Sequence, residues 1–331
     1  MKHLLTILTC LTAITISGQN ISGINLSEPY LKKLEKNNLT IIDSTNLYSN
    51  DGDSKTLFYY SLVPNDAVIG VLVLLPGTWE TVENVFNNNI KLIELAFYSN
   101  LLTIVPSINY NLCLDETALN FLNTTFTDIL RKYKPQKDNF IIAGLSLGGM
   151  NAIRYTEMAY ENEIVAVIKP KAVFAVDPPL DLSRLYYTFL RTIEINFSEL
   201  AVNEAKDYIK RLNNLFGGPP ENYPEKYYKY SMYSRNQKEG GNAKYLKDVP
   251  VRIYSDPDIN WQMKNRHVDY YDMNALDQAA MINELNILGN NEAEFINALG
   301  KGYRLNGMRH PHSWSLIEPT ECVNWIMKYM K

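Results

Sequence analysis

The chain has 331 residues, of which 46% are hydrophobic and 21% are charged, and its net charge is −4. A mildly acidic chain without a basic block lacks the electrostatic footprint of a nucleic-acid-binding protein. Internal repeats and long low-complexity tracts are absent from the sequence. We therefore expect one globular domain with a large core, with room for an insertion.

The first 18 residues predict a cleaved signal peptide. A basic start precedes an apolar stretch over residues 4–16, and small and polar residues follow it, so we expect cleavage near Gly18 and a mature domain over residues 19–331. The apolar stretch is too short to span a bilayer, and no other run approaches that length. We expect an exported protein, in the periplasm or the medium, without a transmembrane segment. Cys10 provides a weaker alternative, a lipoprotein cleavage site.

Two cysteines remain after the signal peptide, Cys113 and Cys322. Export permits a disulfide, but two cysteines so far apart in the sequence do not make a disulfide framework. Both a disulfide and a pair of separate buried thiols stay open.

The predicted elements begin with a short helix at residues 31–39 and a strand of an antiparallel pair at residues 55–63. From residue 68, continuous apolar runs alternate with helical patterns, which is typical of a parallel sheet covered on both faces. The predicted buried strands are residues 69–75, 101–106, 140–143, 172–176 and 251–254, followed by a last strand at 303–308. The predicted helices between and after them are residues 84–99, 115–133 and 316–330.

One interval, residues 181–248, breaks this alternation. It contains a helical pattern at residues 199–215, then a Gly-Gly-Pro-Pro turn, then a tyrosine-dense piece at residues 223–233. Because it falls between the sixth and seventh strands, we interpret it as a lid insertion. The simpler alternative is a surface excursion packed by its own aromatic side chains.

Residues 140–154 read FIIAGLSLGGMNAIR and predict a strand, a sharp turn at Ser146 and a helix. The turn strains the serine backbone, and glycines 144 and 148 leave room where any Cβ would clash. The serine hydroxyl would stand where free N–H groups and the helix dipole stabilise negative charge. This G-x-S-x-G pattern resembles the nucleophile elbow of the α/β-hydrolases.

The number and order of the predicted strands also resemble that family over residues 55–331. The resemblance implies an α/β fold with a mostly parallel, doubly wound sheet of about eight strands and helices on both faces. It also implies the chain order serine, acid, histidine for the catalytic residues.

A serine nucleophile needs a histidine base, and HPHSW lies just before the closing helix, where the family places that base. His312 matches the family's ending, whereas the proline after His310 restricts the backbone there, so we expect His312 and keep His310 as the alternative. His267 lies in a polar helical region and is interpreted as a surface residue. No third ligand of convincing spacing accompanies the two histidines, so we expect no metal and no cofactor.

The acid that orients the histidine should follow the strand at residues 251–254, where Asp256 and Asp258 both lie. Asp256 precedes a proline and suits a turn, and the family places its acid a few residues past the strand, which favours Asp258. Asp177 is a third alternative because some relatives take the acid from the preceding strand. Otherwise Asp177 would fix the Pro-Pro turn that follows it.

An oxyanion hole needs two N–H groups. We expect one from Leu147, the residue after the nucleophile, and the other from Thr78 in the loop after the first buried strand. That loop reads Pro-Gly where relatives often carry His-Gly. Trp79 is expected either to wall the pocket or to be an ordinary packed tryptophan.

These residues predict an exported serine hydrolase that forms an acyl-enzyme on Ser146. Ester cleavage is the first choice because an alkoxide leaves more easily than an amide nitrogen, and the tyrosine-rich insertion favours a small aromatic or sugar-bearing ester. Two alternatives stay open: a serine peptidase with the same residues, and a non-catalytic binding or surface protein on the same fold. Nothing in the sequence indicates an oligomeric state.

Overall fold

The computed structural model describes residues 23–24, 27–40, 46–49 and 57–330. The predicted signal peptide, including Cys10 and Gly18, lies outside the described residues. Within those ranges, no helix has both the length and the apolar character needed to cross a membrane.

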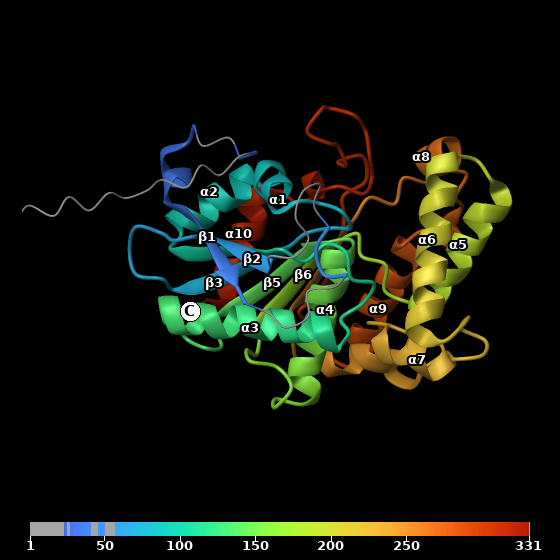
Figure 1. Ribbon diagram of the computed structural model, residues 1–331, viewed down its shortest axis with the longest axis horizontal. Helices are drawn as coiled ribbons and strands as arrows, with labels where there is room; N and C mark the ends of the chain where they lie inside the picture. The colour runs from blue at the N-terminus through green and yellow to red at the C-terminus, as the bar shows by residue number, and fades with distance from the viewer. Residues whose placement is uncertain (1–22, 25–26, 41–45, 50–56, 331) are drawn as a thin grey trace, which may run out of the picture.

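A single eight-stranded sheet runs through the centre of the molecule (Figure 1), as the alternating apolar runs predict. Its strand order is β1-β2-β4-β3-β5-β6-β7-β8. The first two pairings, β1 with β2 and β2 with β4, are antiparallel, and all later pairings are parallel. The strands are β1 (Leu34–Leu39), β2 (Leu57–Leu62), β3 (Gly70–Leu75), β4 (Leu101–Pro106), β5 (Phe140–Leu145), β6 (Ala172–Val176), β7 (Val251–Ser255) and β8 (Ala293–Asn297).

The central strands are buried along their whole length, which explains their continuous apolar sequence. Every residue of β3, β4, β6 and β7 is buried. A parallel sheet with helices on both faces requires such runs, because neither side of the strand meets water. The predicted fold class, α/β with a mostly parallel sheet, is therefore confirmed.

Helices cover both faces of the sheet. Figure 1 shows α3 and α4 on one side and α2 and α10 on the other, and α10 packs against α2. Asp115 caps α3 by accepting a hydrogen bond from the Ala118 N–H, as an acid at this end of a helix should. The helices outside the insertion are α1 (Val82–Asn88), α2 (Ile90–Tyr98), α3 (Glu116–Tyr133), α4 (Leu147–Glu161), α8 (Ile259–Arg266), α9 (Ala275–Ile287) and α10 (Pro319–Tyr329).

Two predicted elements were wrong. Residues 31–39 form a short 3₁₀ turn (Pro29–Lys33) and then strand β1, not a helix, because β1 pairs along its length with β2 at the sheet edge. The last strand is β8, not residues 303–308, which contribute only an isolated bridge between Tyr303 and Arg309. Strand β8 is half-buried, so its sequence lacks the apolar run that marks the other strands.

Residues 181–248 fold as a helical insertion between β6 and β7. It consists of α5 (Leu182–Ile195), α6 (Glu199–Phe216), α7 (Pro224–Tyr230) and a 3₁₀ segment (Lys238–Leu246). In Figure 1, α5 and α6 stand side by side at one end of the sheet.

The tyrosine-dense part of this insertion forms the insertion's own small core. Tyr227 is fully buried, and its ring packs against Phe216 and Tyr186 at centroid distances of 4.6 and 6.0 Å. Tyr230 stacks on Phe216 at 5.5 Å. The faces of these rings are already used in packing, so they do not support the expectation that they bind an aromatic or sugar substrate.

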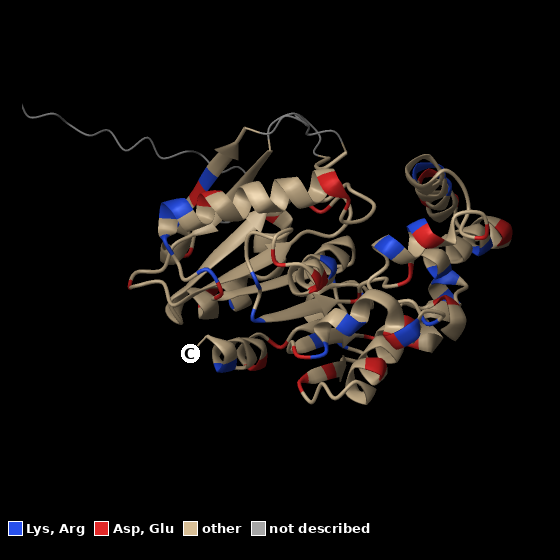
Figure 2. Cartoon of the chain, turned by 90° about the horizontal axis from the view of Figure 1, so that it is seen from below, with Lys and Arg blue, Asp and Glu red and all other residues tan. Residues whose placement is uncertain are grey.

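Charged side chains are concentrated on helices and loops, whereas most of each strand carries none (Figure 2).

Cys113 and Cys322 are both buried and both free, so the structure has separate thiols rather than a disulfide between them.

Candidate active site

Ser146 occupies the turn between β5 and α4. Its φ of 55° and ψ of −119° are strained values for a residue with a side chain. A Cβ on Gly144 would lie 2.1 Å from the Gly148 carbonyl carbon, and one on Gly148 would lie 2.1 Å from the Leu75 carbonyl oxygen. Only glycine fits at either position, because backbone atoms at such distances cannot move aside. The local sequence thus dictates the sharp turn that presents the serine.

The side chain of His312 is paired with Asp177, not with Asp258. His312 Nδ1 lies 2.6 Å from Asp177 Oδ2. The Asp177 side chain is 13% exposed and that of His312 is 32% exposed, so the pair sits at the border between the core and solvent. An acceptor on Nδ1 fixes the tautomer that leaves Nε2 as the free base.

Asp177 is also held by hydrogen bonds to its other carboxylate oxygen and to its backbone carbonyl. Gln278 of α9, fully buried, donates from Nε2 to Asp177 Oδ1 at 2.8 Å and to the Pro178 carbonyl at 3.0 Å. Asn274 donates to the Asp177 carbonyl at 3.1 Å. Asp177 itself has a φ of 45°, a second strained residue at this edge of the sheet. Gln278 could not be identified from the sequence, because no motif marks an amide that lies 101 residues from its partner.

The backbones of Ser146 and Asp177 are neighbours. Ser146 N–H donates to the carbonyl of Val176, the residue just before Asp177, at 2.9 Å. Both residues follow the carboxyl ends of adjacent parallel strands, which lie about 4.8 Å apart. The structure therefore brings the elbow serine and the Asp177–His312 pair to one edge of the sheet. The Ser146 hydroxyl makes no hydrogen bond within the described residues.

Asp256 and Asp258 instead anchor the loop that carries the histidines. Asp256 accepts hydrogen bonds from the Gly300 and Gly302 N–H groups at 3.0 and 2.9 Å. Asp258 caps α8 through the Trp261 N–H at 3.0 Å. Both carboxylates also pair with Arg309, at 2.7 and 3.0 Å. The prediction that Asp258 orients the histidine was wrong because Arg309 occupies the carboxylate.

His310 supports His312 rather than replacing it. Its Nδ1 lies 3.0 Å from the His312 carbonyl oxygen, and its Nε2 accepts from Arg266 and Arg304 at 3.0 and 3.1 Å. Burial, with the nearby Arg266 and Arg304 charges, lowers the pKa of His310 to about 3. The imidazole is thus neutral, with its proton on Nδ1 where it can donate to the carbonyl. Both ring nitrogens are engaged, so the alternative base is not placed for proton transfer.

The loop after β3 brings Thr78 to the same edge of the sheet. Within the described residues the Thr78 N–H donates to no acceptor, and Leu147 is the first residue of α4, where an N–H has no intrahelical partner. The Trp79 N–H is already used, since it donates to the Asn109 carbonyl at 2.9 Å. Between Thr78 and Trp79, Thr78 is therefore the residue whose backbone N–H is free to bind an oxyanion.

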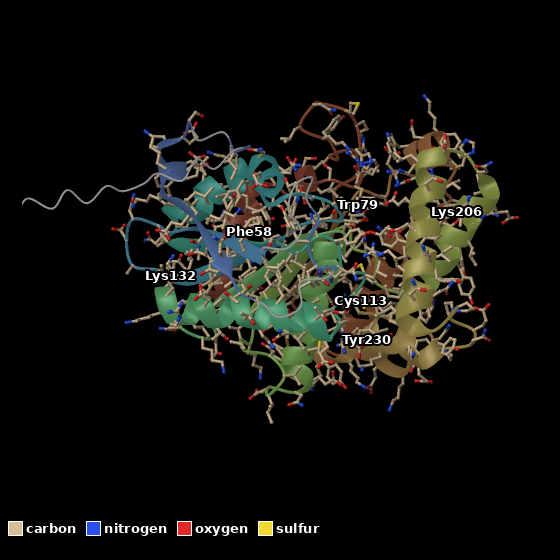
Figure 3. The ribbon with its side chains drawn as sticks, viewed as in Figure 1. Phe58, Trp79, Cys113, Lys132, Lys206 and Tyr230 are labelled. Carbon is tan, nitrogen blue, oxygen red and sulfur yellow. The ribbon has the colours of Figure 1, made fainter. Side chains whose placement is uncertain are left out.

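The insertion touches this loop directly. Tyr208 of α6 donates its hydroxyl hydrogen to Thr78 Oγ1 at 2.7 Å, and its ring stacks on Phe189 at 4.8 Å. Trp79, with a φ of 57°, is 45% exposed and lies 6.4 Å from the Tyr208 ring. Figure 3 shows Trp79 on the side of the sheet that faces α6. Its ring stands at the rim between the loop and the insertion, not in the core.

Glu80 connects the Thr78 loop to the histidine loop. Its carboxylate accepts from the Gly77 N–H at 2.9 Å and from the Trp314 indole N–H at 2.9 and 3.0 Å. Burial raises the pKa of Glu80, while these donors and the nearby His312 oppose that rise. Glu80 could not be identified from the sequence, because an acid directly after a turn gives no signal that its partner lies 234 residues away.

Across the described ranges, no group of three or more His, Cys, Asp or Glu side chains is arranged to hold a metal ion.

No family model and no curated protein sequence matches the chain. Solved structures match its fold. An esterase from Rhizomucor miehei has a TM-score of 0.55 at 13% identity, over 90% of this chain and 84% of that one. Carboxyl esterase 2 from Tuber melanosporum has a TM-score of 0.53 at 13% identity, over 92% and 87%. The acylaminoacyl peptidase of Pyrococcus horikoshii has a TM-score of 0.52 at 14% identity, over 90% and 42%.

These similarities in fold agree with the sheet order and with the strained serine between β5 and α4. The chain has the α/β-hydrolase fold.

Proposed function

We propose that the protein is a serine hydrolase that cleaves carboxylic esters through an acyl-enzyme on Ser146. The observation that carries this proposal is the Asp177–His312 contact of 2.6 Å beside a serine on a strained strand-to-helix turn. A carboxylate on Nδ1 and a serine at a helix start are the arrangement that nucleophilic acyl transfer requires.

In this mechanism His312 Nε2 takes the proton of the Ser146 hydroxyl as Oγ attacks the ester carbonyl carbon. Asp177 holds the imidazole in the required tautomer and stabilises the imidazolium that forms. The N–H groups of Thr78 and Leu147 stabilise the oxyanion, and each such donor contributes about 3 kcal/mol to transition-state stabilisation. His312 then protonates the leaving alkoxide, and water, activated by the same imidazole, releases the acid.

Ester cleavage is favoured over amide cleavage because an alkoxide is the better leaving group. The fold neighbours whose names describe esterases support the same choice, although their identity to this chain is low. Amide cleavage is the second candidate, since a peptidase is also among the neighbours. The helical insertion would act as a lid in either case, with Tyr208 joining it to the Thr78 loop.

A substrate panel tests the proposal. The mature protein should hydrolyse short p-nitrophenyl esters faster than peptide p-nitroanilides, and Ser146→Ala should abolish both activities. Fast peptide turnover with inert esters would assign the peptidase function instead. If neither the wild type nor Ser146→Ala hydrolyses either class of substrate, the result would indicate a non-catalytic protein on this fold.

We also infer that the protein is exported after cleavage near Gly18. The basic and apolar pattern of residues 1–18 supports this. The amino-terminal sequence of protein recovered outside the cytoplasm should begin close to residue 19, and an intact residue 1 in that material would contradict cleavage.

A further inference from the structure

Two arginines, Arg266 and Arg304, contact His310, whose ring lies next to the ring of His312. Arg266, the last residue of α8, and Arg304, in the loop before the histidines, both donate to His310 Nε2, at 3.0 and 3.1 Å. The His310 and His312 ring centroids are 6.4 Å apart. Both residues are exposed as a whole, whereas burial of the Arg266 guanidinium lowers its pKa, so this group is partly withdrawn from water.

The arrangement leaves most of the guanidinium donors without an acceptor among the described residues. Each guanidinium carries five N–H donors, yet both groups share one uncharged acceptor. In the described part of the chain neither arginine forms an ion pair with a carboxylate, whereas Arg309, in the same loop, is paired with both Asp256 and Asp258. Two like charges beside a neutral ring repel each other unless an anion binds between them.

The acids nearest this pair act on it from beyond ion-pair distance. Glu204 of α6 is close enough to Arg266 and His312 for both to lower its pKa, although burial raises that pKa overall. Asp177 also acts on Arg266, but its carboxylate is engaged by His312 and Gln278. Neither acid forms an ion pair with Arg266 or Arg304 in the described part of the chain, so the guanidinium N–H groups are left without a charged acceptor. A planar carboxylate matches the guanidinium fork and would satisfy these donors.

We infer that Arg266 and Arg304 bind a carboxylate group of the substrate, so that the preferred substrates are small esters that carry a second, ionised carboxyl group. This inference rests on the proposed function, since it assigns the charge of the substrate cleaved at Ser146. Bidentate contact between a guanidinium and a carboxylate is strong and directional. It would hold the ester in a fixed orientation beside the histidine pair.

Matched pairs of esters test the inference. Mono-4-nitrophenyl glutarate is compared with its methyl ester, which places the carboxylate on the acyl side. The pair 4-carboxyphenyl acetate and 4-(methoxycarbonyl)phenyl acetate places it on the alcohol side. Wild type should prefer the anionic member of at least one pair in kcat/KM. Arg266→Gln and Arg304→Gln should each lower that anionic-to-neutral ratio about tenfold, as loss of a charge-assisted hydrogen bond implies.

The control is Lys264→Gln, which removes one exposed positive charge from the same helix, two residues before Arg266. Its anionic-to-neutral ratio should stay within about twofold of wild type, because an exposed charge away from the site is largely screened. Using the ratio separates charge recognition from any effect of the arginines on His310, because such an effect changes both esters alike. Ratios that are the same in wild type and both arginine variants, for both pairs, would overturn the inference.

A binding measurement keeps the test independent of turnover. Calorimetric titration with glutarate at low ionic strength should give a Kd at least about tenfold weaker in each arginine variant than in wild type. Wild type that binds no glutarate, or variants that bind it equally well, would overturn the carboxylate site. If the neutral esters are inert and glutarate still binds through the arginines, the proposed ester hydrolysis fails while the anion site stands.

Discussion

Asp177 Oδ2 lies 2.6 Å from His312 Nδ1, although 135 residues separate the two along the chain. The contact joins the end of β6 to the loop before α10. Arg309, three residues before His312, pairs with Asp256 and Asp258 at the end of β7, and His312 reaches the end of the adjacent strand β6.

Replacing Asp177 with Asn should lower kcat by about 10³- to 10⁴-fold, because an amide no longer enforces the productive tautomer of His312. The matched variant Asp258→Asn should cost at least about a hundredfold less, since Asp258 contacts Arg309 and the start of α8. Steady-state rates on one p-nitrophenyl ester check both. If Asp258→Asn proves as damaging as Asp177→Asn, the assignment of the acid is incorrect.

Gln278 should act as a positioning residue for Asp177. Gln278→Leu removes the donors to the carboxylate and to the Pro178 carbonyl, and should reduce kcat about tenfold or more while KM changes less than about threefold. Asn274→Ala, which removes a donor to the Asp177 backbone only, is the control and should cost less. A Gln278→Leu variant with altered stability but unchanged kcat would limit the residue to a structural role.

Tyr208 and Thr78 should be energetically coupled. Tyr208→Phe and Thr78→Val each remove the single hydrogen bond between α6 and the loop after β3. A double-mutant cycle on kcat/KM should give a coupling energy of about 0.5–1.5 kcal/mol, in the range of one hydrogen bond. Strictly additive effects would mean that the insertion does not control the loop through this contact.

His310 should make the fold less stable in mild acid. Its folded pKa of about 3 lies below the unfolded value of about 6.5, so between these two pH values the unfolded chain binds more protons. The contribution of His310 to the free energy of unfolding therefore falls as the pH drops through that window. His310→Gln keeps an acceptor for the arginines and should reduce the loss of stability between about pH 7 and about pH 5.

Urea denaturation at the two pH values measures that loss. Asp277 acts in the opposite direction, since burial raises its pKa to about 6 and its contribution falls as the pH rises from about 4 to about 6. The contribution of Asp277 is the same in wild type and variant, so it cancels when the two are compared. His267→Gln removes an exposed imidazole and is the control. An identical pH dependence in wild type and His310→Gln would contradict the assignment.

Local sequence determined the parts of the fold that local physics controls. The runs that form β3, β4, β5, β6 and β7 are buried on both faces, and a buried strand has a continuous apolar sequence. The turn at Ser146 could be predicted because the crowding at Gly144 and Gly148 admits no other residue. Strands β1 and β8 escaped prediction because both are edge strands without a continuous buried run: β1 is largely exposed and β8 is half-buried.

The acid at the site could not be chosen from the sequence, because three aspartates follow two adjacent strands. Their roles depend on Arg309, whose pairing with Asp256 and Asp258 is a long-range contact that no local pattern encodes. The contacts of Glu80 with Trp314 and of Gln278 with Asp177 are likewise tertiary. His312 could be predicted, since its place before α10 follows from chain order.

Covalent labelling tests whether Ser146 is an activated nucleophile. Mature protein treated with a fluorophosphonate should gain one adduct by intact mass, mapped to Ser146 by peptide sequencing, and Ser146→Ala should gain none. Asp177→Asn should label much more slowly than wild type, because the base is no longer oriented. A folded wild-type protein that acquires no adduct at Ser146, or an adduct that persists in Ser146→Ala, would show that Ser146 is not the nucleophile.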